Sequence, residues 1–251
     1  MEEGGGPLSE KNVNRSRDEA IEKIEYYIIK NKLEPHAKIP SERDLCELWG
    51  FNRTTLRFAI QRLVIEGKLY QKKGSGTYVA KPKLLRNLQD LKSLSTEVNE
   101  CGQTLISKVL SADIIESNNQ IAQKLHIPLG DKVYALTRLR YIDGEPATIE
   151  TSFMNYENFK EINLHDFSKE SLYSVMENEY NVQIIKGEEK IGISYATEYE
   201  AKLLGIDPGK AVFYLTGIVY NEKETPVEYF KSIVRSDKIR FSSILRQRGE
   251  G

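Results

Sequence analysis

The part of this sequence that most restricts its fold is residues 16–80, where three helical patterns precede a glycine-containing hairpin. Apolar residues recur at three- and four-residue spacing, and this periodicity predicts a first helix over residues 16–32. Ser41 and Asp44 have the spacing of a capping box, so a second helix should begin just after Ser41. Gly50 then ends that helix in a tight turn, which is the arrangement of a helix-turn-helix.

The third helix, expected over residues 53–63, separates two kinds of side chain. Leu56 and the apolar residues that follow it at helical spacing face inward, whereas basic and hydroxyl side chains crowd the first turn of the opposite face. In a recognition helix this turn meets base edges in the major groove, where arginine suits guanine and threonine suits thymine or phosphate. A merely solvated basic face is the alternative for this helix taken alone. The side chains predicted to contact DNA here are Arg53, Thr54, Thr55 and Arg57.

Residues 66–79 predict a strand, a turn and a second strand. Two glycines permit a tight hairpin, and two lysines put positive charge at its tip. Such a wing can press against phosphates or enter the neighbouring minor groove. A wing that follows a helix-turn-helix favours DNA binding over the solvated-face alternative. The predicted wing contacts are Lys72, Lys73, Gly74, Ser75 and Gly76.

Charge is distributed unevenly along the 251 residues. Residues 11–80 hold 14 lysines and arginines against 9 acidic residues, whereas the whole chain has a net charge of −1. The basic first part fits a DNA-binding module that is joined to a domain with another task.

Several classes of protein are disfavoured. No apolar run approaches the roughly 20 residues of a membrane span, and the start lacks a secretory signal, so we expect a cytoplasmic protein with no membrane partner. Cys46 and Cys101 are far apart and have no histidine at metal-ligand spacing, so no disulfide, metal site or cofactor is predicted. The chain lacks a nucleophile elbow and a phosphate-binding glycine loop, and no catalytic residues are predicted.

Residues 122–141 and 201–220 repeat each other at a constant offset of 79, with eight identical positions of twenty. Each copy predicts a short helix, a turn and a long strand that continues through another turn into a further strand. Two copies form a duplicated α+β unit, and we expect the halves to pair in one antiparallel sheet.

The two copies differ in their arginines. Arg138 and Arg140 correspond to Gly217 and Val219, and residues two apart on a strand share a face. Two guanidinium groups on one face form a strong receptor for phosphate or carboxylate. The alternative, an exposed face on which the arginines pair with Glu150, is equally compatible with the spacing.

Domain boundaries follow from these patterns. The glycine-rich start has neither apolar periodicity nor a capping signal. Lys-Pro-Lys at residues 81–83 begins a linker, beyond which alternating strand patterns dominate. The expected parts are a disordered tail (1–14), a winged helix-turn-helix (15–80), a linker (81–90) and a second domain (91–247).

Residues 16–80 resemble the winged-helix domain of the GntR superfamily of bacterial regulators. The resemblance implies that Arg43 lies at DNA, together with the residues named above on the third helix and Gly76 of the hairpin. His36 departs from the family, which usually has glycine there, so we expect a difference in the loop before the second helix. The matching motifs are Pro40-Ser41-Glu42, Arg53-Thr54-Thr55-Leu56-Arg57, Glu66-Gly67 and Gly74-Ser75-Gly76-Thr77-Tyr78-Val79.

Residues from about 90 to 247 resemble the UTRA ligand-binding domain of the HutC subfamily, whose fold is like that of chorismate lyase. The matching segments include Ser93-Leu94-Ser95-Thr96-Glu97-Val98, Arg138-Leu139-Arg140-Tyr141, Glu150-Thr151-Ser152-Phe153 and Ser171-Leu172-Tyr173. The resemblance implies a bound sugar phosphate. The implied contacts are Ser93, Arg138, Arg140, Ser171 and Tyr173 for the anion, and Glu150 and Glu228 for the sugar.

Taken together, the resemblance implies a transcription regulator, with repression favoured, that binds operator DNA as a homodimer. A small anionic effector would modulate that binding. A sugar phosphate is favoured, and organic acids and other small molecules are also allowed by the resemblance. Two alternatives remain: a C-terminal domain that only dimerises, and an enzyme. The shared fold of a lyase does not by itself establish activity.

Overall fold

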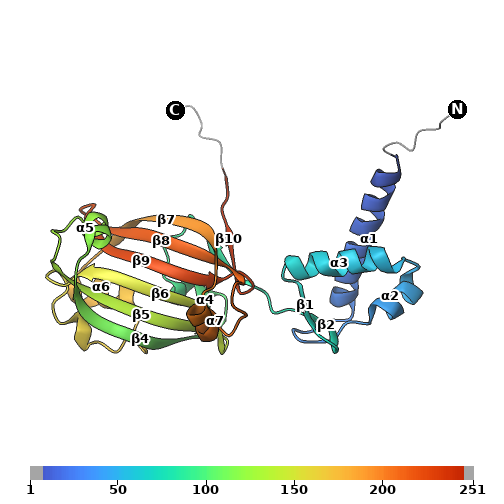
Figure 1. Ribbon diagram of the computed structural model, residues 1–251, viewed down its shortest axis with the longest axis horizontal. Coiled ribbons are helices and arrows are strands. Elements are labelled where there is room, and N and C mark those ends of the chain that lie inside the picture. The colour runs from blue at the N-terminus through green and yellow to red at the C-terminus, as the bar shows by residue number, and fades with distance from the viewer. Residues whose placement is uncertain (1–7, 246–251) are drawn as a thin grey trace. The chain divides into compact units, whose positions relative to one another are not determined.

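The computed structural model describes residues 8–245, with side chains from Arg15 onward (Figure 1). The chain forms two compact units. The first ends at Lys83 and the second begins at Leu84, and each unit has its own buried core. Residues 1–7 of the predicted tail, and the last two residues of the predicted second domain, lie outside the described residues.

The first unit consists of three helices followed by a two-stranded hairpin, which confirms the predicted winged helix-turn-helix. The two strands are antiparallel, with Lys72 opposite Gly76 next to the turn. The elements are α1 (Leu8–Lys30), α2 (Glu42–Trp49), α3 (Arg53–Ile65), β1 (Leu69–Lys72) and β2 (Gly76–Val79).

Helix α1 begins earlier than the apolar periodicity indicates. It starts at Leu8 rather than near Ser16, so the prediction of a disordered tail is wrong for residues 8–14. No glycine or proline occurs in residues 8–30, and a helix that has nucleated gains residues at little cost. Apolar periodicity therefore locates the part of a helix that packs against a core and not its first residue.

Side-chain bonds to the backbone set the starts of α2 and α3. Ser41 Oγ accepts from the Asp44 backbone N–H while Asp44 accepts from the Ser41 backbone N–H, which confirms the predicted capping box. Asn52 Oδ1 caps α3 by accepting from the Thr55 backbone N–H at 2.8 Å. Between the helices, Gly50 has a φ of +73°, a left-handed conformation that glycine adopts without steric cost.

The core of the first unit is built around α3. Its four inward residues, Leu56, Ala59, Ile60 and Leu63, are each at most 1% exposed. They pack against apolar side chains of α1, α2 and both hairpin strands. This packing holds α3 in place and leaves its opposite face exposed to solvent.

The second unit is a six-stranded antiparallel sheet with helices on both faces. The strand order is β4-β5-β6-β9-β8-β7, and two short strands, β3 and β10, form a separate parallel pair. The elements are β3 (Leu84–Asn87), α4 (Leu94–Glu100), β4 (Leu105–Glu116), α5 (Asn119–Leu125), β5 (Lys132–Ile142), β6 (Glu145–Asn155), η1 (Ile162–Leu164), α6 (Leu172–Tyr180), β7 (Ile184–Tyr195), α7 (Glu198–Leu204), β8 (Ala211–Asn221), β9 (Pro226–Arg235) and β10 (Ile239–Ser242).

This strand order confirms the predicted duplication. The elements β4, α5 and β5 recur as β7, α7 and β8 at an offset of 79 residues. The copies join through β6 and β9, which are antiparallel neighbours at the centre of the sheet. Joining the copies there pairs two strands that would otherwise be exposed edges, which explains why the halves form one sheet.

The expected linker over residues 81–90 is wrong in part, because Leu84–Asn87 forms β3. Leu84 is 2% exposed and lies opposite Ile239 of β10. The partner strand comes near the other end of the chain, so no local pattern in the sequence predicts this pairing.

Helices α4 and α6 cover one face of the sheet, and α5 and α7 cover the other. On β5, Tyr134 packs with Met176 of α6, whereas the adjacent Val133 packs with residues of α5. Because side chains alternate along a strand, Arg138 and Arg140 lie on the same face as Tyr134. This places both arginines beneath α4 and α6.

Gly217, the counterpart of Arg138 in the second copy, lies where a larger residue does not fit. A Cβ there would lie 2.4 Å from Phe230 Cζ and 2.7 Å from the backbone oxygen of Glu188. We expect Gly217→Ala to destabilise the second unit by about 1–3 kcal/mol, the usual cost of overpacking, as measured by urea unfolding. Gly192→Ala is the matched control, because the nearest atom to its Cβ would be 3.9 Å away. Equal unfolding midpoints for the two variants would contradict this expectation.

Candidate functional site

The first unit carries a groove of about 630 Å³ between the N-terminal ends of α2 and α3 and the hairpin. Basic side chains from the helices, the hairpin and the loop before α2 line it, and Glu42 is the acidic side chain in that lining. A concave basic surface beside the first turn of α3 suits the phosphate backbone of DNA. The basic residues are Lys38, Arg43, Arg53, Arg57, Lys72 and Lys73.

The groove brings together most of the predicted DNA contacts. Arg43, Arg53, Arg57 and residues 72–76 all line it, and Thr54 is exposed in the first turn of α3. Thr55 requires a correction, since it is 6% exposed and buried rather than presented to DNA. It lies four residues before Ala59 and so belongs to the inward stripe of the helix.

Two of the groove arginines are already paired with carboxylates. Arg57 Nη2 donates to Glu42 Oε2 at 3.1 Å, and Arg43 Nε donates to Glu47 Oε1 at 3.0 Å. Both arginine side chains are more than half exposed, and such pairs contribute about 0–1 kcal/mol. The arginines can therefore exchange these partners for phosphates at small cost.

Gly76 brings the hairpin against the loop that precedes α2. Its φ is +129°, and a Cβ there would lie 2.6 Å from Lys38 Cε. Lys38 is bridged to Tyr78 of β2 through the backbone and adds a cation to the groove that the sequence patterns did not single out. His36, in the same loop, has a φ of +72°, which explains why glycine would fit easily at that position.

The second unit contains a pocket on the α4/α6 face of the sheet, with a cavity of about 70 Å³. All seven residues that the resemblance implies for the effector line this pocket, although their role in binding stays a prediction. They come from five elements or from N-cap residues: Ser93 (N-cap of α4), Arg138 and Arg140 (β5), Glu150 (β6), Ser171 (N-cap of α6), Tyr173 (α6) and Glu228 (β9).

Arg138 and Arg140 share the carboxylate of Glu150. Glu150 lies opposite Arg138 in the β5–β6 register, and Arg138 Nη2 donates to its Oε1. Arg140 Nη1 lies 3.3 Å from the same oxygen. The pairing of the arginines with Glu150, one of the two possibilities that their spacing left open, is therefore present. Each arginine is only 4% exposed, however, so this face of the strand is buried and not exposed to solvent.

The ionisation of this cluster leaves an excess of positive charge. Burial lowers the pKa of Arg140 to about 10, so its guanidinium stays charged at neutral pH. Burial opposes ionisation of Glu150, but Arg138 and Arg140 together outweigh it and lower the pKa of that carboxyl. Two buried cations are thus matched by one carboxylate.

Several buried donors at the pocket have no hydrogen-bond partner among the described residues. They are Arg138 Nε, Arg140 Nε and Thr148 Oγ1. A buried polar group without a partner costs about 1–3 kcal/mol. A ligand that accepts hydrogen bonds here would remove this cost.

The first turn of α6 also lines the pocket. Ser171 occupies the N-cap position, but its side chain makes no capping hydrogen bond. The N–H groups of a first helical turn lack intrahelical partners, and the helix dipole favours negative charge beside them. An anion in the pocket would therefore meet helix amides as well as the arginines.

Glu228 and Tyr173 form a second polar pair in the pocket. Tyr173 Oη donates to Glu228 Oε2 at 2.8 Å. Burial raises the pKa of Glu228 to about 7, and burial also holds the pKa of Tyr173 well above its ordinary value. Glu228 thus carries only part of a negative charge at neutral pH, and a partly protonated carboxyl can both donate to and accept from ligand hydroxyl groups.

Arg86 and Lys92 line the same pocket but were missed by the sequence patterns. Arg86 Nε donates to the buried Glu97 of α4 at 2.6 Å, and Arg86 Nη1 lies 3.7 Å from a carboxylate oxygen of Glu189 on β7. Both basic residues come from the segment expected to be a linker or from its border. Only the long-range β3–β10 pairing brings Arg86 to the pocket.

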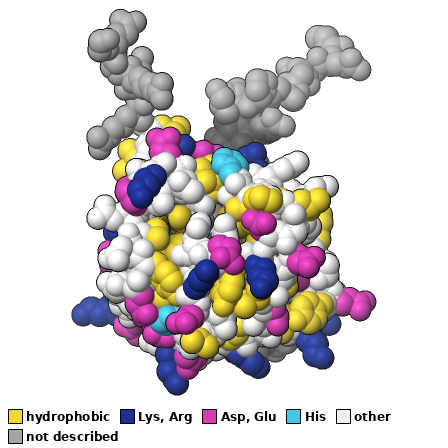
Figure 2. Space-filling view, turned by 90° about the vertical axis from the view of Figure 1, so that its left-hand side faces the viewer, with side chains coloured by type: hydrophobic (Ala, Val, Ile, Leu, Met, Phe, Trp, Pro, Cys, Tyr) yellow, Lys and Arg dark blue, Asp and Glu magenta, His cyan; other side chains and the backbone are white. Residues whose placement is uncertain are grey.

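Figure 2 shows one outer face of the second unit, on which charged side chains of both signs are scattered among hydrophobic ones. In the visible part of this face, lysines and arginines do not gather as they do in the groove of the first unit. The groove is the candidate for DNA because its lining is basic and lies beside the first turn of α3.

A winged helix-turn-helix with a basic groove beside its third helix is the arrangement of a DNA-binding transcription regulator. Residues 16–79 match the family described as bacterial regulatory proteins of the gntR family, and residues 100–240 match the UTRA domain. The chain belongs to the GntR family of bacterial transcription regulators, in its UTRA-containing branch. It is a DNA-binding transcription regulator.

Known relatives span nearly the same length. The chain is 33% identical over 221 residues to the HTH-type transcriptional repressor NagR of Bacillus subtilis (strain 168), covering 88% of this chain and 90% of that protein. It is 28% identical over 205 residues to the probable fructoselysine utilization operon transcriptional repressor of Escherichia coli (strain K12), covering 80% and 83%. The crystal structure of PhnF from Mycobacterium smegmatis has the same fold, with a TM-score of 0.69, 21% identity, and coverage of 91% of this chain and 100% of that one.

No helix within residues 8–245 is both long enough and apolar enough to cross a membrane.

Proposed function

We propose that this protein is a repressor whose hold on operator DNA is controlled by a phosphorylated sugar bound in the arginine pocket of the second unit. The observation that carries the proposal is the state of Arg138 and Arg140, which are buried, share one carboxylate and leave both Nε donors unpaired. Such a site has positive charge and hydrogen-bond donors to offer an anion.

The pocket suits the two parts of a sugar phosphate differently. The arginines, Ser171 and the first turn of α6 supply donors to a phosphate. Glu150 and Glu228 supply acceptors to sugar hydroxyl groups. The relative named for fructoselysine utilization supports a sugar-derived effector.

Control of DNA binding requires the effector to prefer one arrangement of the protein. In this proposal a homodimer presents two copies of α3 to a pseudo-palindromic operator, so the spacing of the half-sites must match the dimer. An effector that binds better to an arrangement with the wrong spacing releases the DNA.

The edge strand β7 supports the homodimer in this proposal. Ile191, Ile193 and Tyr195 alternate along it and share a face, with exposures of 37%, 75% and 70%. Exposed apolar side chains in a row on an edge strand favour contact with a second copy. Sedimentation of the full chain, alone and with operator, measures this state.

A ligand panel tests the proposed effector class. The full chain is heated with hexose 6-phosphates, amino-sugar 6-phosphates, the same sugars without phosphate, and dicarboxylic acids. We expect a specific sugar phosphate at 100 times its dissociation constant to add about 2.7 kcal/mol of stability and to release a labelled operator. If only a dicarboxylic acid stabilises the protein, the effector is an organic acid and not a sugar phosphate. If no compound changes either stability or operator binding, a second unit that only dimerises becomes the better explanation.

A further inference from the structure

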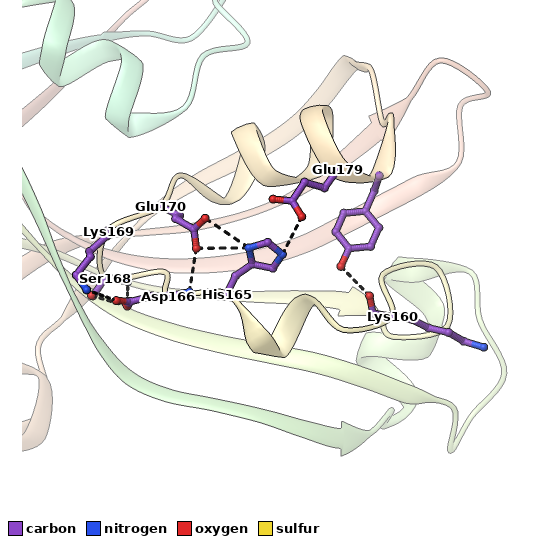
Figure 3. A network of polar contacts seen from close by, with 8 residues as sticks. Lys160, His165, Asp166, Ser168, Lys169, Glu170 and Glu179 are labelled. Carbon is purple, nitrogen blue, oxygen red and sulfur yellow. Dashed lines mark hydrogen bonds and ion pairs between the residues drawn. The ribbon is translucent and has the colours of Figure 1, made fainter.

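A second cluster of ionisable side chains lies at the two ends of α6, apart from the residues that line the pocket. His165 follows η1, Glu170 precedes α6, and Glu179 lies in the last turn of α6 (Figure 3). One nitrogen of His165 and one oxygen from each carboxylate all lie within 4.8 Å of one another. No step of the proposed regulatory mechanism uses these three residues.

Each ring nitrogen of His165 faces a carboxylate. Nδ1 is 3.4 Å from Glu170 Oε2, and Nε2 is 3.3 Å from Glu179 Oε2 (Figure 3). A neutral imidazole has a single N–H, so in that form one nitrogen would point its lone pair at a carboxylate oxygen. A cation bound between that nitrogen and the carboxylate would be coordinated by both groups.

We propose that His165 Nε2 and Glu179 bind a divalent transition-metal ion, with zinc as the representative case, while Glu170 accepts the hydrogen bond of Nδ1–H. Zinc bonds to histidine nitrogen and carboxylate oxygen are about 2.0–2.2 Å, and a tetrahedral angle then separates the two ligand atoms by about 3.3–3.5 Å. The Nε2 to Glu179 separation is 3.3 Å. A carboxylate on the other ring nitrogen is the common support of a metal-bound histidine.

The surrounding contacts hold these groups in place. The His165 side chain is 17% exposed, and its ring centroid lies 5.9 Å from that of Phe167. Glu170 also accepts from the Asp166 backbone N–H at 2.9 Å. His165 and Glu170 are thus held in position by contacts that do not require a bound ion.

The last turn of α6 is anchored as well, and the nearby lysine is engaged elsewhere. Tyr180 Oη donates to the backbone oxygen of Lys160 at 2.7 Å, which ties the end of α6 to the segment before His165. Lys169 lies 2.9 Å from Asp166 rather than on either glutamate of the cluster (Figure 3). A metal ion would therefore join both ends of α6 through His165.

Isothermal titration of zinc chloride into the full, untagged chain tests this site, after treatment with a chelator. We expect saturable binding of one ion per chain at the cluster, together with a cobalt(II) visible spectrum that changes on binding. His165→Asn and Glu179→Gln should lose this binding event. Glu170→Gln should weaken it by about 10- to 100-fold, the usual effect of removing the carboxylate behind a metal-bound histidine.

A matched control is His126→Asn, an exposed histidine at the end of α5 that should leave the binding event unchanged. Metal-free unfolding of each variant verifies that the second unit is folded. Zinc binding by His165→Asn with wild-type affinity and stoichiometry would overturn the proposal. Absence of binding to the wild-type chain would also overturn it. Because zinc alone is the probe, either result is independent of the sugar-phosphate proposal.

Discussion

Arg138→Met is expected to weaken effector binding by about 10- to 150-fold, which corresponds to about 1.5–3 kcal/mol for a lost hydrogen bond to a charged group. Methionine keeps much of the length of the side chain but removes its charge and its donors. Arg140 and Glu150 then neutralise each other, so the cluster of Arg138, Arg140 and Glu150 loses its excess positive charge. The basic groove of the first unit is untouched, and operator affinity should stay near the wild-type value. Calorimetry with the active compound of the panel, together with an operator-release titration, measures both quantities.

Two further variants make this prediction specific. Arg138→Lys keeps the charge but loses the planar fork, so its loss of affinity should be smaller than that of Arg138→Met. Lys231→Met removes a positive charge from β9, where the lysine bonds Gln120 and does not line the pocket, and it should respond to effector normally. Release of Arg138→Met from the operator at wild-type effector concentrations would show that the anion site is misplaced.

The double variant Arg53→Ala, Arg57→Ala is expected to lose about 2–6 kcal/mol of operator binding, since an arginine that reads a base contributes about 1–3 kcal/mol. Both residues line the basic groove beside the first turn of α3. The Arg57–Glu42 pair that would also be lost is exposed and contributes little to folding. Fluorescence anisotropy with a labelled operator, measured at several salt concentrations, gives the loss and the change in salt dependence.

Arg62→Ala is the matched control on the same helix. Arg62 pairs with Glu66 at 2.8 Å and does not line the groove. Arg62→Ala should keep close to wild-type operator affinity, and both the double variant and Arg62→Ala should bind effector normally. If the double variant binds the operator as tightly as Arg62→Ala does, the first turn of α3 does not contact the DNA.

Much of the DNA-binding unit could be predicted because its signals are local. The capping box at Ser41, the left-handed Gly50 and the inward stripe of α3 each depend on residues a few positions apart. The error at Thr55 has the same origin. Its hydroxyl suggested a DNA contact, but its helical position placed it in the buried stripe.

The pocket was predicted from two sources, the comparison of the two copies of the repeat and the family resemblance. Differences between the copies singled out Arg138 and Arg140, and the family resemblance supplied the remaining five residues that line the pocket with them. Arg86 could not be predicted as a pocket residue because it reaches the pocket through the pairing of β3 with β10. The His165 cluster could not be predicted because Glu179 is brought to His165 only by the packing of α6 against the sheet.

By itself, the sequence determined the winged helix-turn-helix, the duplication, the order of elements within each copy of the repeat, and the pair of arginines on one strand face. These follow from caps, periodicity and repeat spacing, which act over short stretches of chain or by direct comparison of two stretches. The tertiary structure alone decided that the arginine face is buried, that a single carboxylate is shared between the two guanidiniums, and that β3 belongs to the second unit. Burial and ionisation depend on which distant segments pack together, and that packing is a property of the whole fold.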